Sequence, residues 1–113
     1  MLIVADKEME KWLLEQWDGM LDWDAGNIRK QAKHEVTKAQ IEQLFAKRFV
    51  FVGEVIPEDG TEWKERRHLL LGETGQPRKL AIIWTTRGLK IRPICCRSMR
   101  DGEKAYFKTK ING

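Results

Sequence analysis

The fold of this chain is decided by residues 79–97, which read KLAIIWTTRGLKIRPICCR. In this stretch two runs of apolar and β-branched residues, 79–86 and 89–97, flank the turn dipeptide Arg87-Gly88. The pattern predicts two antiparallel strands joined by a tight hairpin. Two runs of the same kind, at 49–56 and 66–72, come before them, and turn segments at 57–60 and 75–77 separate the runs. We therefore expect a four-stranded antiparallel meander.

The last of these strands contains a spacing problem. Arg92 and Arg97 are five residues apart, so a regular strand would point them to opposite faces of the sheet. Pro93 lies between them, and proline inside a sheet is typical of a bulge, which adds one residue and shifts the phase of the later residues. Alternatively, Arg97 lies just past the strand, at the cap of the last helix. Either arrangement would let both arginines serve one site.

Three helices are predicted before the sheet. Residues 6–18 carry apolar side chains at helical spacing, with Asp6 available as the N-cap. Asp24 can cap a second helix that runs to about residue 34. Thr37 and Gln40 have the spacing of a capping box in front of a third helix.

A fourth helix is predicted after the sheet. Ser98 and Asp101 have the spacing of a capping start, although Gly102 weakens the helix by about 1 kcal/mol relative to alanine. The expected fold class is therefore α+β, with N-terminal helices packed on a four-stranded antiparallel sheet and a helix at the C-terminal end. We expect residues 1–113 to form a single domain, because a chain of this length has no room for a separate cofactor domain.

Charge is divided unevenly along the chain. Residues 1–24 hold two basic and seven acidic residues, a net charge of −5, whereas residues 25–63 are balanced. Residues 64–113 hold thirteen basic and four acidic residues, a net charge of +9. This asymmetry indicates an anionic partner, either nucleic acid or an acidic protein, and the alternative is a solvated basic face.

Other features narrow the class of protein. The sequence has no apolar run of the roughly 20 residues that span a bilayer, and it does not begin like a signal peptide, so we expect a cytoplasmic protein with no membrane partner. Cys95 and Cys96 are adjacent and should point to opposite faces of a strand, which does not suit a framework disulfide. Neither His34 nor His68 lies at a ligand spacing that would complete a zinc site with them. We therefore expect no metal and no cofactor.

Two ordered sets of residues resemble the BrnT toxin family, over about residues 21–107. The first set consists of Leu21-Asp22-Trp23-Asp24, Asn27, Lys30, Lys33-His34, Val36, Ile41-Glu42 and Phe45. The second set consists of Glu65-Arg66-Arg67, the stretches 69–72 and 80–84, Thr86-Arg87, Ile91-Arg92, Ile94, Arg97, Glu103 and Tyr106.

The resemblance implies a RelE-like fold and a type II toxin-antitoxin function. It implies an endoribonuclease that blocks translation and that a ribbon-helix-helix antitoxin of the BrnA type neutralises. Operator DNA would then be contacted only through the complex with the antitoxin. A non-catalytic nucleic-acid-binding or regulatory module on the same fold remains the main alternative, and a pure protein-interaction partner is a weaker one.

The chain departs from the family pattern in three places. Glu35 stands where the usual residue after the histidine is glycine, and Cys95-Cys96 stands where the usual pair is Ser-Ala. Residues 1–19 are extra, so we expect an added N-terminal helix in front of a toxin domain at 20–110. Its apolar stripe should dock on the domain, while its acidic residues lie against basic ones or extend an interface. Such a helix would either complete the core or shield the RNA surface.

Candidate catalytic residues are inferred from the needs of RNA cleavage without a metal. Attack of a ribose 2′-hydroxyl on its phosphate needs a base, an acid and cations where charge develops. Arginine suits the cationic role, and His34 is the leading base or acid because imidazole titrates near pH 6.5. The alternatives are charges that only steer phosphate and a histidine that only contacts the end of a helix. His68 lies off the pattern, and Glu65, Glu103 and Tyr106 remain as unranked proton carriers or orienting partners.

The predicted site therefore has two groups of residues. The catalytic candidates are His34, Glu65, Arg67, Arg92, Arg97, Glu103 and Tyr106. The RNA-binding candidates are Lys33, Trp63, Lys64, Arg66, Arg87 and Lys90. Trp63 is included because its polar, basic surroundings suit stacking on RNA, whereas the other tryptophans are expected in the core or an interface.

Overall fold

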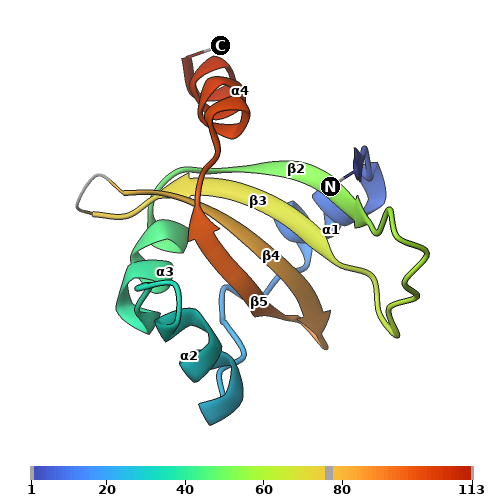
Figure 1. Ribbon diagram of the computed structural model, residues 1–113, viewed down its shortest axis with the longest axis horizontal. Helices are drawn as coiled ribbons and strands as arrows, with labels where there is room; N and C mark the ends of the chain where they lie inside the picture. Colours follow the sequence, from blue (N-terminus) through green and yellow to red (C-terminus); the bar gives the residue numbers. More distant parts are fainter. Residues whose placement is uncertain (1, 76–77, 113) are drawn as a thin grey trace.

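An antiparallel sheet with helices on both of its faces forms the framework of the protein (Figure 1). The computed structural model describes residues 2–75 and 78–112. The strands are β1 (Leu2–Val4), β2 (Phe49–Ile56), β3 (His68–Glu73), β4 (Lys79–Arg87) and β5 (Lys90–Ser98), in that order across the sheet. The helices are α1 (Lys7–Glu15), α2 (Ala25–Ala32), α3 (Lys38–Ala46) and α4 (Asp101–Asn112). The α+β class is confirmed.

The predicted number of four strands is wrong, because β1 adds a fifth. This strand pairs antiparallel with β2 and places Ile3 opposite Val55. Three residues carry no periodicity of their own, and their partner lies far along the chain, so the sequence pattern gave no local signal. Gly53 permits the pairing, since a Cβ atom at that position would overlap the carbonyl oxygen of Val4. Of the predicted turn at 75–77, residues 76–77 lie outside the described residues.

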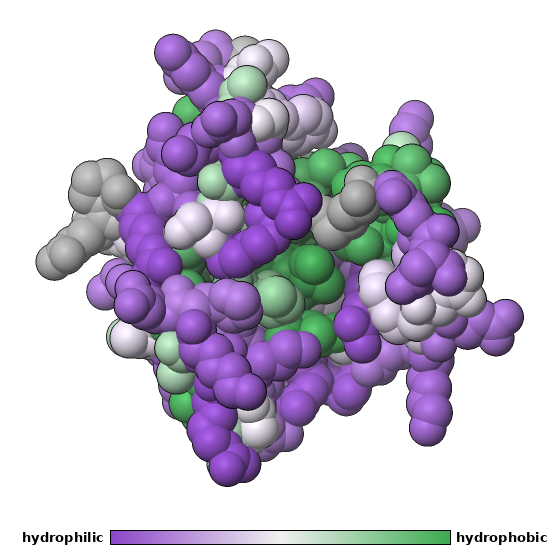
Figure 2. Space-filling model, viewed as in Figure 1, coloured by the Kyte–Doolittle hydropathy of each residue, from purple (hydrophilic) through white to green (hydrophobic). Residues whose placement is uncertain are grey.

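The core has two parts, one on each face of the sheet. On one face, Leu70, Ile82 and Trp84 pack against Leu13 of α1 and Ile41 of α3. The other face carries the second cluster, in which α4 contributes Phe107 and the sheet contributes Val55, Leu69, Leu71 and Ala81. We call this second face the open face, because α4 covers only part of it and apolar side chains are exposed beside the helix (Figure 2).

The N-caps predicted from sequence for the first three helices are confirmed. The carboxylate of Asp6 accepts the backbone N–H of Met9 at 3.1 Å, and Asp24 forms a full capping box with Asn27. Thr37 and Gln40 form the predicted box in front of α3. These bonds satisfy backbone donors that the first turn of a helix leaves without partners.

The N-terminal helix docks on the domain, as its apolar stripe predicted. Leu13 is buried, and the ring of Trp12 stacks on that of Trp84 with centroids 6.2 Å apart. The helix lies behind the sheet in Figure 1, on the face opposite to α4. Of the two outcomes considered for this segment, α1 therefore completes the core.

The acidic N-terminal residues lie against the basic half of the chain. Asp6 binds Arg66 at 2.7 Å, and Asp18 binds Lys90 at 3.4 Å. Arg92 forms ion pairs with Asp22 and Asp24, in the segment before α2. The charge asymmetry of the sequence is thus partly neutralised inside the molecule.

The predicted capping start of the last helix at Ser98 is wrong. Ser98 is still the last residue of β5, where it lies opposite Leu80, and α4 begins only at Asp101. The carboxylate of Glu103 accepts the backbone N–H of Arg100 at 2.8 Å, so this side chain supplies the cap instead. No helix in the described part of the chain is both long and apolar enough to cross a membrane.

The segment at residues 20–22 lies along the outer edge of β5 and pairs with it. Leu21 forms a parallel bridge with Ile91. Ile91 donates its N–H to the carbonyl of Met20 at 3.2 Å and accepts the N–H of Asp22 at 2.8 Å. This short segment leads directly into the cap of α2.

Glu35 adopts a left-handed backbone conformation, with φ of 57°. This conformation costs about 1–2 kcal/mol for a residue with a Cβ atom and is free for glycine, the residue that the BrnT pattern has here. We expect Glu35→Gly to stabilise the protein by about 1 kcal/mol, measured as the free energy of unfolding in urea. Glu58→Gly, outside the left-handed region, is the control and should not stabilise the protein. An unchanged or lower stability of Glu35→Gly would contradict the strain argument.

Candidate active site

A bulge in β5 brings two distant arginines to the same face. Ile83 lies opposite Cys95 and Trp84 lies opposite Pro93, so Ile94 is the additional residue. After this shift Arg92 lies opposite Thr85 and Arg97 opposite Ala81. Since residues 81 and 85 of β4 point to the same face, both arginines lie on the open face. The bulge predicted from Pro93 is confirmed.

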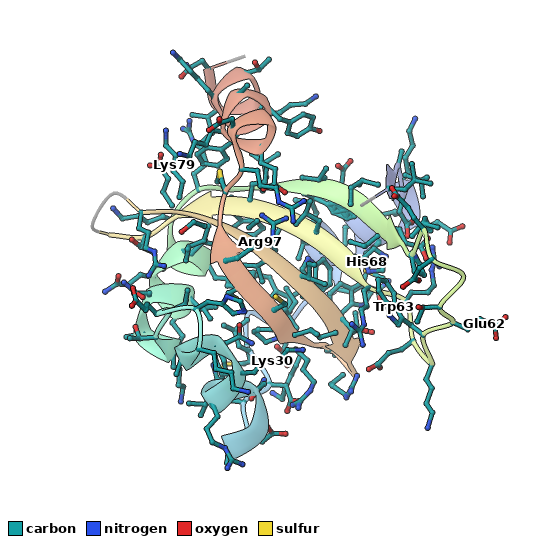
Figure 3. The ribbon with its side chains drawn as sticks, in the orientation of Figure 1. Lys30, Glu62, Trp63, His68, Lys79 and Arg97 are labelled. Atoms are coloured by element: carbon teal, nitrogen blue, oxygen red, sulfur yellow. The ribbon has the colours of Figure 1, made fainter. Side chains whose placement is uncertain are left out.

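Two further arginines reach this face at the end of the sheet near Arg92. The guanidinium of Arg67 lies over the ring of Trp63, which packs on the open face, at 4.4 Å from the ring centroid. Arg87 continues the alternation of β4 and binds Glu65 at 3.0 Å. Arg97 is farther off. The residues opposite Arg92 and Arg97 in β4, Thr85 and Ala81, are four positions apart, which is about 13 Å at the usual rise of a strand. Figure 3 shows Arg97 and Trp63 toward opposite ends of the sheet.

Arg97 is held in a bidentate ion pair. Its two terminal nitrogens lie 2.7 and 2.9 Å from the carboxylate oxygens of Glu103, and the side chains are 19% and 16% exposed. Burial raises the pKa of Glu103, but the hydrogen bonds from Arg97 and from the backbone of Arg100 outweigh it and leave the pKa below its usual value. Both groups are therefore charged at neutral pH, and α4 is anchored to β5 at this point.

A groove of about 410 Å³ opens beside this ion pair. Arg100, Glu103 and Tyr106 line it from the start of α4, and Tyr106 is 37% exposed. Gly102 also lines it, and the apolar floor comes from Ile3, Val52, Leu69 and Leu71 of three neighbouring strands. Figure 2 shows apolar surface exposed beside α4. The groove thus joins polar, ionisable groups to an apolar floor.

The opposite end of the open face carries an aromatic side chain with a cation. Trp63 is half-buried and lines a cavity of about 360 Å³ with Val55 and Ile83. The Nε of Arg67 is buried and has no hydrogen-bond partner among the described residues. Among the described residues, Arg67 is thus paired with no carboxylate, whereas Arg87 and Arg97 are each paired with one.

Arg92 is clamped by two carboxylates that sequence reasoning did not assign to the site. Its terminal nitrogens lie 2.8 Å from Asp22 and 2.8 Å from Asp24. Burial lowers the pKa of Arg92, but the hydrogen bonds to both carboxylates raise it overall. The signal was available in the acidic Asp22-Trp23-Asp24 motif and the charge asymmetry, but nothing local linked it to Arg92.

Several predicted site residues lie away from the Arg97 ion pair. His34 and Lys33 are exposed after the end of α2, where Arg78 donates to the carbonyl of His34 at 3.1 Å. Arg66 is bound to Asp6 and to Glu54, which accept at 2.7 and 2.8 Å. Lys90 is paired with Asp18, and Lys64 is exposed in the loop before β3.

His68 serves the attachment of α1. Its side chain is buried beneath the ring of Trp84, and its Nε2 lies 3.1 Å from the carboxylate of Asp6. Burial lowers the pKa of His68 more than the Asp6 carboxylate raises it, so the imidazole is neutral at pH 7. Because Asp6 also caps α1, this contact ties the start of the helix to β3.

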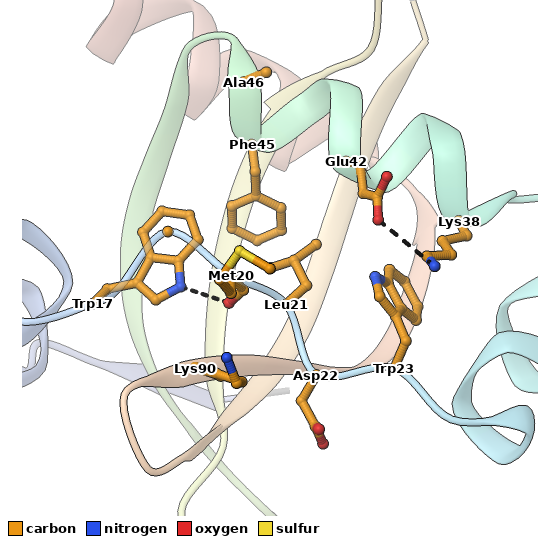
Figure 4. A pocket seen from close by; sticks show the side chains of 11 residues that line it. Trp17, Met20, Leu21, Asp22, Trp23, Lys38, Glu42, Phe45, Ala46 and Lys90 are labelled. Atoms are coloured by element: carbon orange, nitrogen blue, oxygen red, sulfur yellow. Dashed lines mark hydrogen bonds and ion pairs between the residues drawn. The ribbon is translucent and has the colours of Figure 1, made fainter.

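A larger cavity lies on the other side of the protein, between α3 and the segment at 17–23. It measures about 650 Å³, and Figure 4 shows Trp17, Trp23 and Phe45 around it. Its charged rim is internally paired, since Lys38 lies 4.0 Å from Glu42. The described residues that line this cavity offer apolar surface and include no arginine.

The described residues hold no cluster of three histidine, cysteine, aspartate or glutamate side chains able to bind a metal ion. Cys95 and Cys96 are both free thiols. Burial raises the pKa of Cys96, so this thiol stays protonated.

The fold and the open face define a small basic α+β protein with four arginines, Arg67, Arg87, Arg92 and Arg97, on one face of its sheet. Residues 23–103 match the family described as the ribonuclease toxin BrnT of type II toxin-antitoxin systems. The chain belongs to this family, whose substrate class is RNA and whose partner class is an antitoxin. No curated protein and no solved structure matches the chain. The match includes Arg67, Arg92, Arg97 and Glu103, whereas β1, α1 and Tyr106 lie outside it.

Proposed function

We propose that this protein is a metal-independent endoribonuclease that cleaves RNA on the open face and thereby inhibits translation. Its fold is RelE-like in this proposal, with the toxin domain at residues 20–110. A BrnA-like ribbon-helix-helix antitoxin neutralises it in the cytoplasm, and operator DNA is contacted only through the antitoxin complex. The family match supports the class of activity and of partner.

The observation that carries the proposal is the bulge at Ile94. Without it, Arg92 and Arg97 would point to opposite faces of the sheet. With it, both lie on the face where Arg67 rests on Trp63 and where Glu103 and Tyr106 line a groove. An RNA backbone laid along this face would contact Arg67 and Arg92 at one end and Arg97 at the other. Next to Arg97 it would also meet the ionisable groups of Glu103 and Tyr106 at the groove.

Arg97 and Glu103 are proposed to exchange partners during cleavage. A phosphate that takes the two guanidinium donors of Arg97 replaces the carboxylate of Glu103. Glu103 then loses the hydrogen bonds from Arg97 that help to lower its pKa and becomes a better base for the ribose 2′-hydroxyl. Arg97 stabilises the charge that develops on the phosphate, and Tyr106 supplies a hydroxyl proton to the leaving oxygen.

The remaining candidates bind and position RNA in this proposal. Arg67 and Arg92 hold flanking phosphates, and Glu65 orients Arg87. Trp63 stacks a base, and the other proposed RNA contacts are Lys33, Lys64, Arg66 and Lys90. His34 is kept as the alternative proton carrier to Glu103.

Incubation of the purified protein with single-stranded RNA in excess EDTA tests the activity. We expect internal cleavage that leaves 2′,3′-cyclic phosphate ends, because the attacking group is the neighbouring 2′-hydroxyl and no metal takes part. RNA binding without cleavage would contradict the proposal and favour a non-catalytic nucleic-acid-binding module. Cleavage that EDTA abolishes would contradict the metal-independent mechanism.

A further inference from the structure

The groove beside α4 has one wall that the family match does not include. Ile3 belongs to β1, which precedes the matched residues 23–103, and its side chain lines the groove together with Glu103 and Tyr106. In the strand register Ile3 lies opposite Val55, a residue of the open-face cluster. The added N-terminal segment therefore contributes directly to the candidate active site, although α1 packs on the other face.

The floor of the groove is suited to a flat apolar surface. Ile3, Val52, Leu69 and Leu71 come from three adjacent strands, and none of them carries a polar side-chain atom. The volume of about 410 Å³ lies within the range of small-ligand pockets, about 300–1,000 Å³. A nucleobase presents such a flat surface, and it stacks on aromatic or apolar side chains with little dependence on its identity.

The polar end of the groove explains why a nucleotide fits it better than a purely apolar ligand. Glu103 at this end is the ion-pair partner of Arg97, so a phosphate bound to Arg97 lies at the mouth of the groove. Tyr106 places an exposed aromatic ring on the same wall, and Lys110 lies 5.5 Å from the centroid of that ring. One ligand with an anionic and a flat apolar part would satisfy both ends.

We propose that this groove binds the nucleobase next to the scissile phosphate, and that Ile3 is a substrate-positioning residue supplied by the N-terminal segment. This inference rests on the proposed ribonuclease function. It adds the location of a base-binding subsite and a role for β1 in it. The apolar floor of the groove contacts the faces of a base, so its floor residues position RNA without selecting a particular base.

A methyl NMR titration tests the subsite without relying on cleavage. The full-length protein is titrated with guanosine 3′-monophosphate and, separately, uridine 3′-monophosphate. We expect both nucleotides to shift the methyl signals of Ile3, Val52, Leu69 and Leu71. Val4 follows Ile3 in β1, so its side chain points to the opposite face of the sheet. Its methyl signals should therefore stay in place and serve as the internal control.

A matched pair of variants tests the role of Ile3 in the reaction. Ile3→Ala is expected to raise KM for RNA about tenfold with kcat within about twofold, because it removes apolar surface under the base. Val4→Ala removes a side chain of similar size from the same strand and should leave KM unchanged. Thermal unfolding of both variants shows whether β1 stays paired, and the nucleotide titration is repeated on Ile3→Ala.

The outcomes separate this inference from the proposed function. RNA cleavage with an unchanged KM in Ile3→Ala and unmoved groove methyls would overturn the subsite while the ribonuclease stands. Groove methyls that shift with nucleotides in a protein that cleaves no RNA would support the subsite and overturn the ribonuclease. Methyls that respond only to an antitoxin chain, and not to either nucleotide, would overturn the subsite in favour of a protein-docking surface.

Discussion

An Arg97→Ala variant is expected to lose RNA cleavage by about 100- to 1,000-fold in kcat, the usual effect of removing one preorganised donor from a developing negative charge. The guanidinium of Arg97 offers two parallel donors that a phosphate can take from Glu103. Steady-state cleavage of a short fluorescent RNA in EDTA measures the loss. Arg97→Lys keeps the charge but not the planar fork and should fall between the wild type and Arg97→Ala.

Two controls separate chemistry from folding. Arg29→Ala removes an arginine charge from α2, where Arg29 donates to the carbonyl of Ala25 in the same helix, and should keep full activity. Arg97→Ala leaves Glu103 without its main partner and is expected to cost on the order of 1–3 kcal/mol of stability. Glu103→Gln should cost a similar amount, so the two unfolding curves reveal how much of the loss is structural. A folded Arg97→Ala protein with normal kcat would contradict the assignment.

A chain that begins at Met20 is expected to fail to fold, which is the largest stability effect that the structure predicts. It lacks β1 and α1, and with them the stacking of Trp12 on Trp84 and the contact between Asp6 and His68. The part of the sheet around Trp84 that α1 covers would then be exposed to water. Far-UV circular dichroism and a thermal melt measure the outcome. A cooperative melt at the temperature of the full chain would contradict the core role of α1.

A matched pair within α1 gives a graded version of this test. Leu13 is 7% exposed and Leu14 is 81% exposed, so the same substitution at neighbouring positions samples the two sides of the helix. Leu13→Ala is expected to lower the free energy of unfolding by about 3 kcal/mol. Leu14→Ala should change it by less than about 0.5 kcal/mol. Equal effects at both positions would show that the helix does not pack as described.

The elements that the sequence predicted are those whose signals are local. Asp6, Asp24 and Thr37 each act within three or four residues, and all three cap the helices expected of them. The strands joined by short turns were also predictable, because neighbouring strands in this sheet are consecutive along the chain. The resemblance to the family indicated which strands carry the candidate site residues. The family match confirms the resemblance.

The features that were missed depend on partners far apart in sequence. β1 is a strand only because β2 lies beside it, and Ser98 stays in β5 because Leu80 pairs with it. The same holds for the site, where Pro93 correctly predicted the bulge but no pattern linked Arg92 to its two carboxylates. The candidate roles of His34 and the other site residues remain predictions, since position alone does not test chemistry.

The segment at residues 20–22 has a consequence for association between chains. The border of a sheet presents unpaired N–H and C=O groups on which a strand of another molecule can add, and aggregation often starts there. On one border the N–H and C=O of Ile91 are already bonded to Met20 and Asp22, and on the other border β1 is only three residues long. The sheet thus offers few free backbone groups at these two places, and we expect a partner chain to bind its faces or helices rather than to extend it.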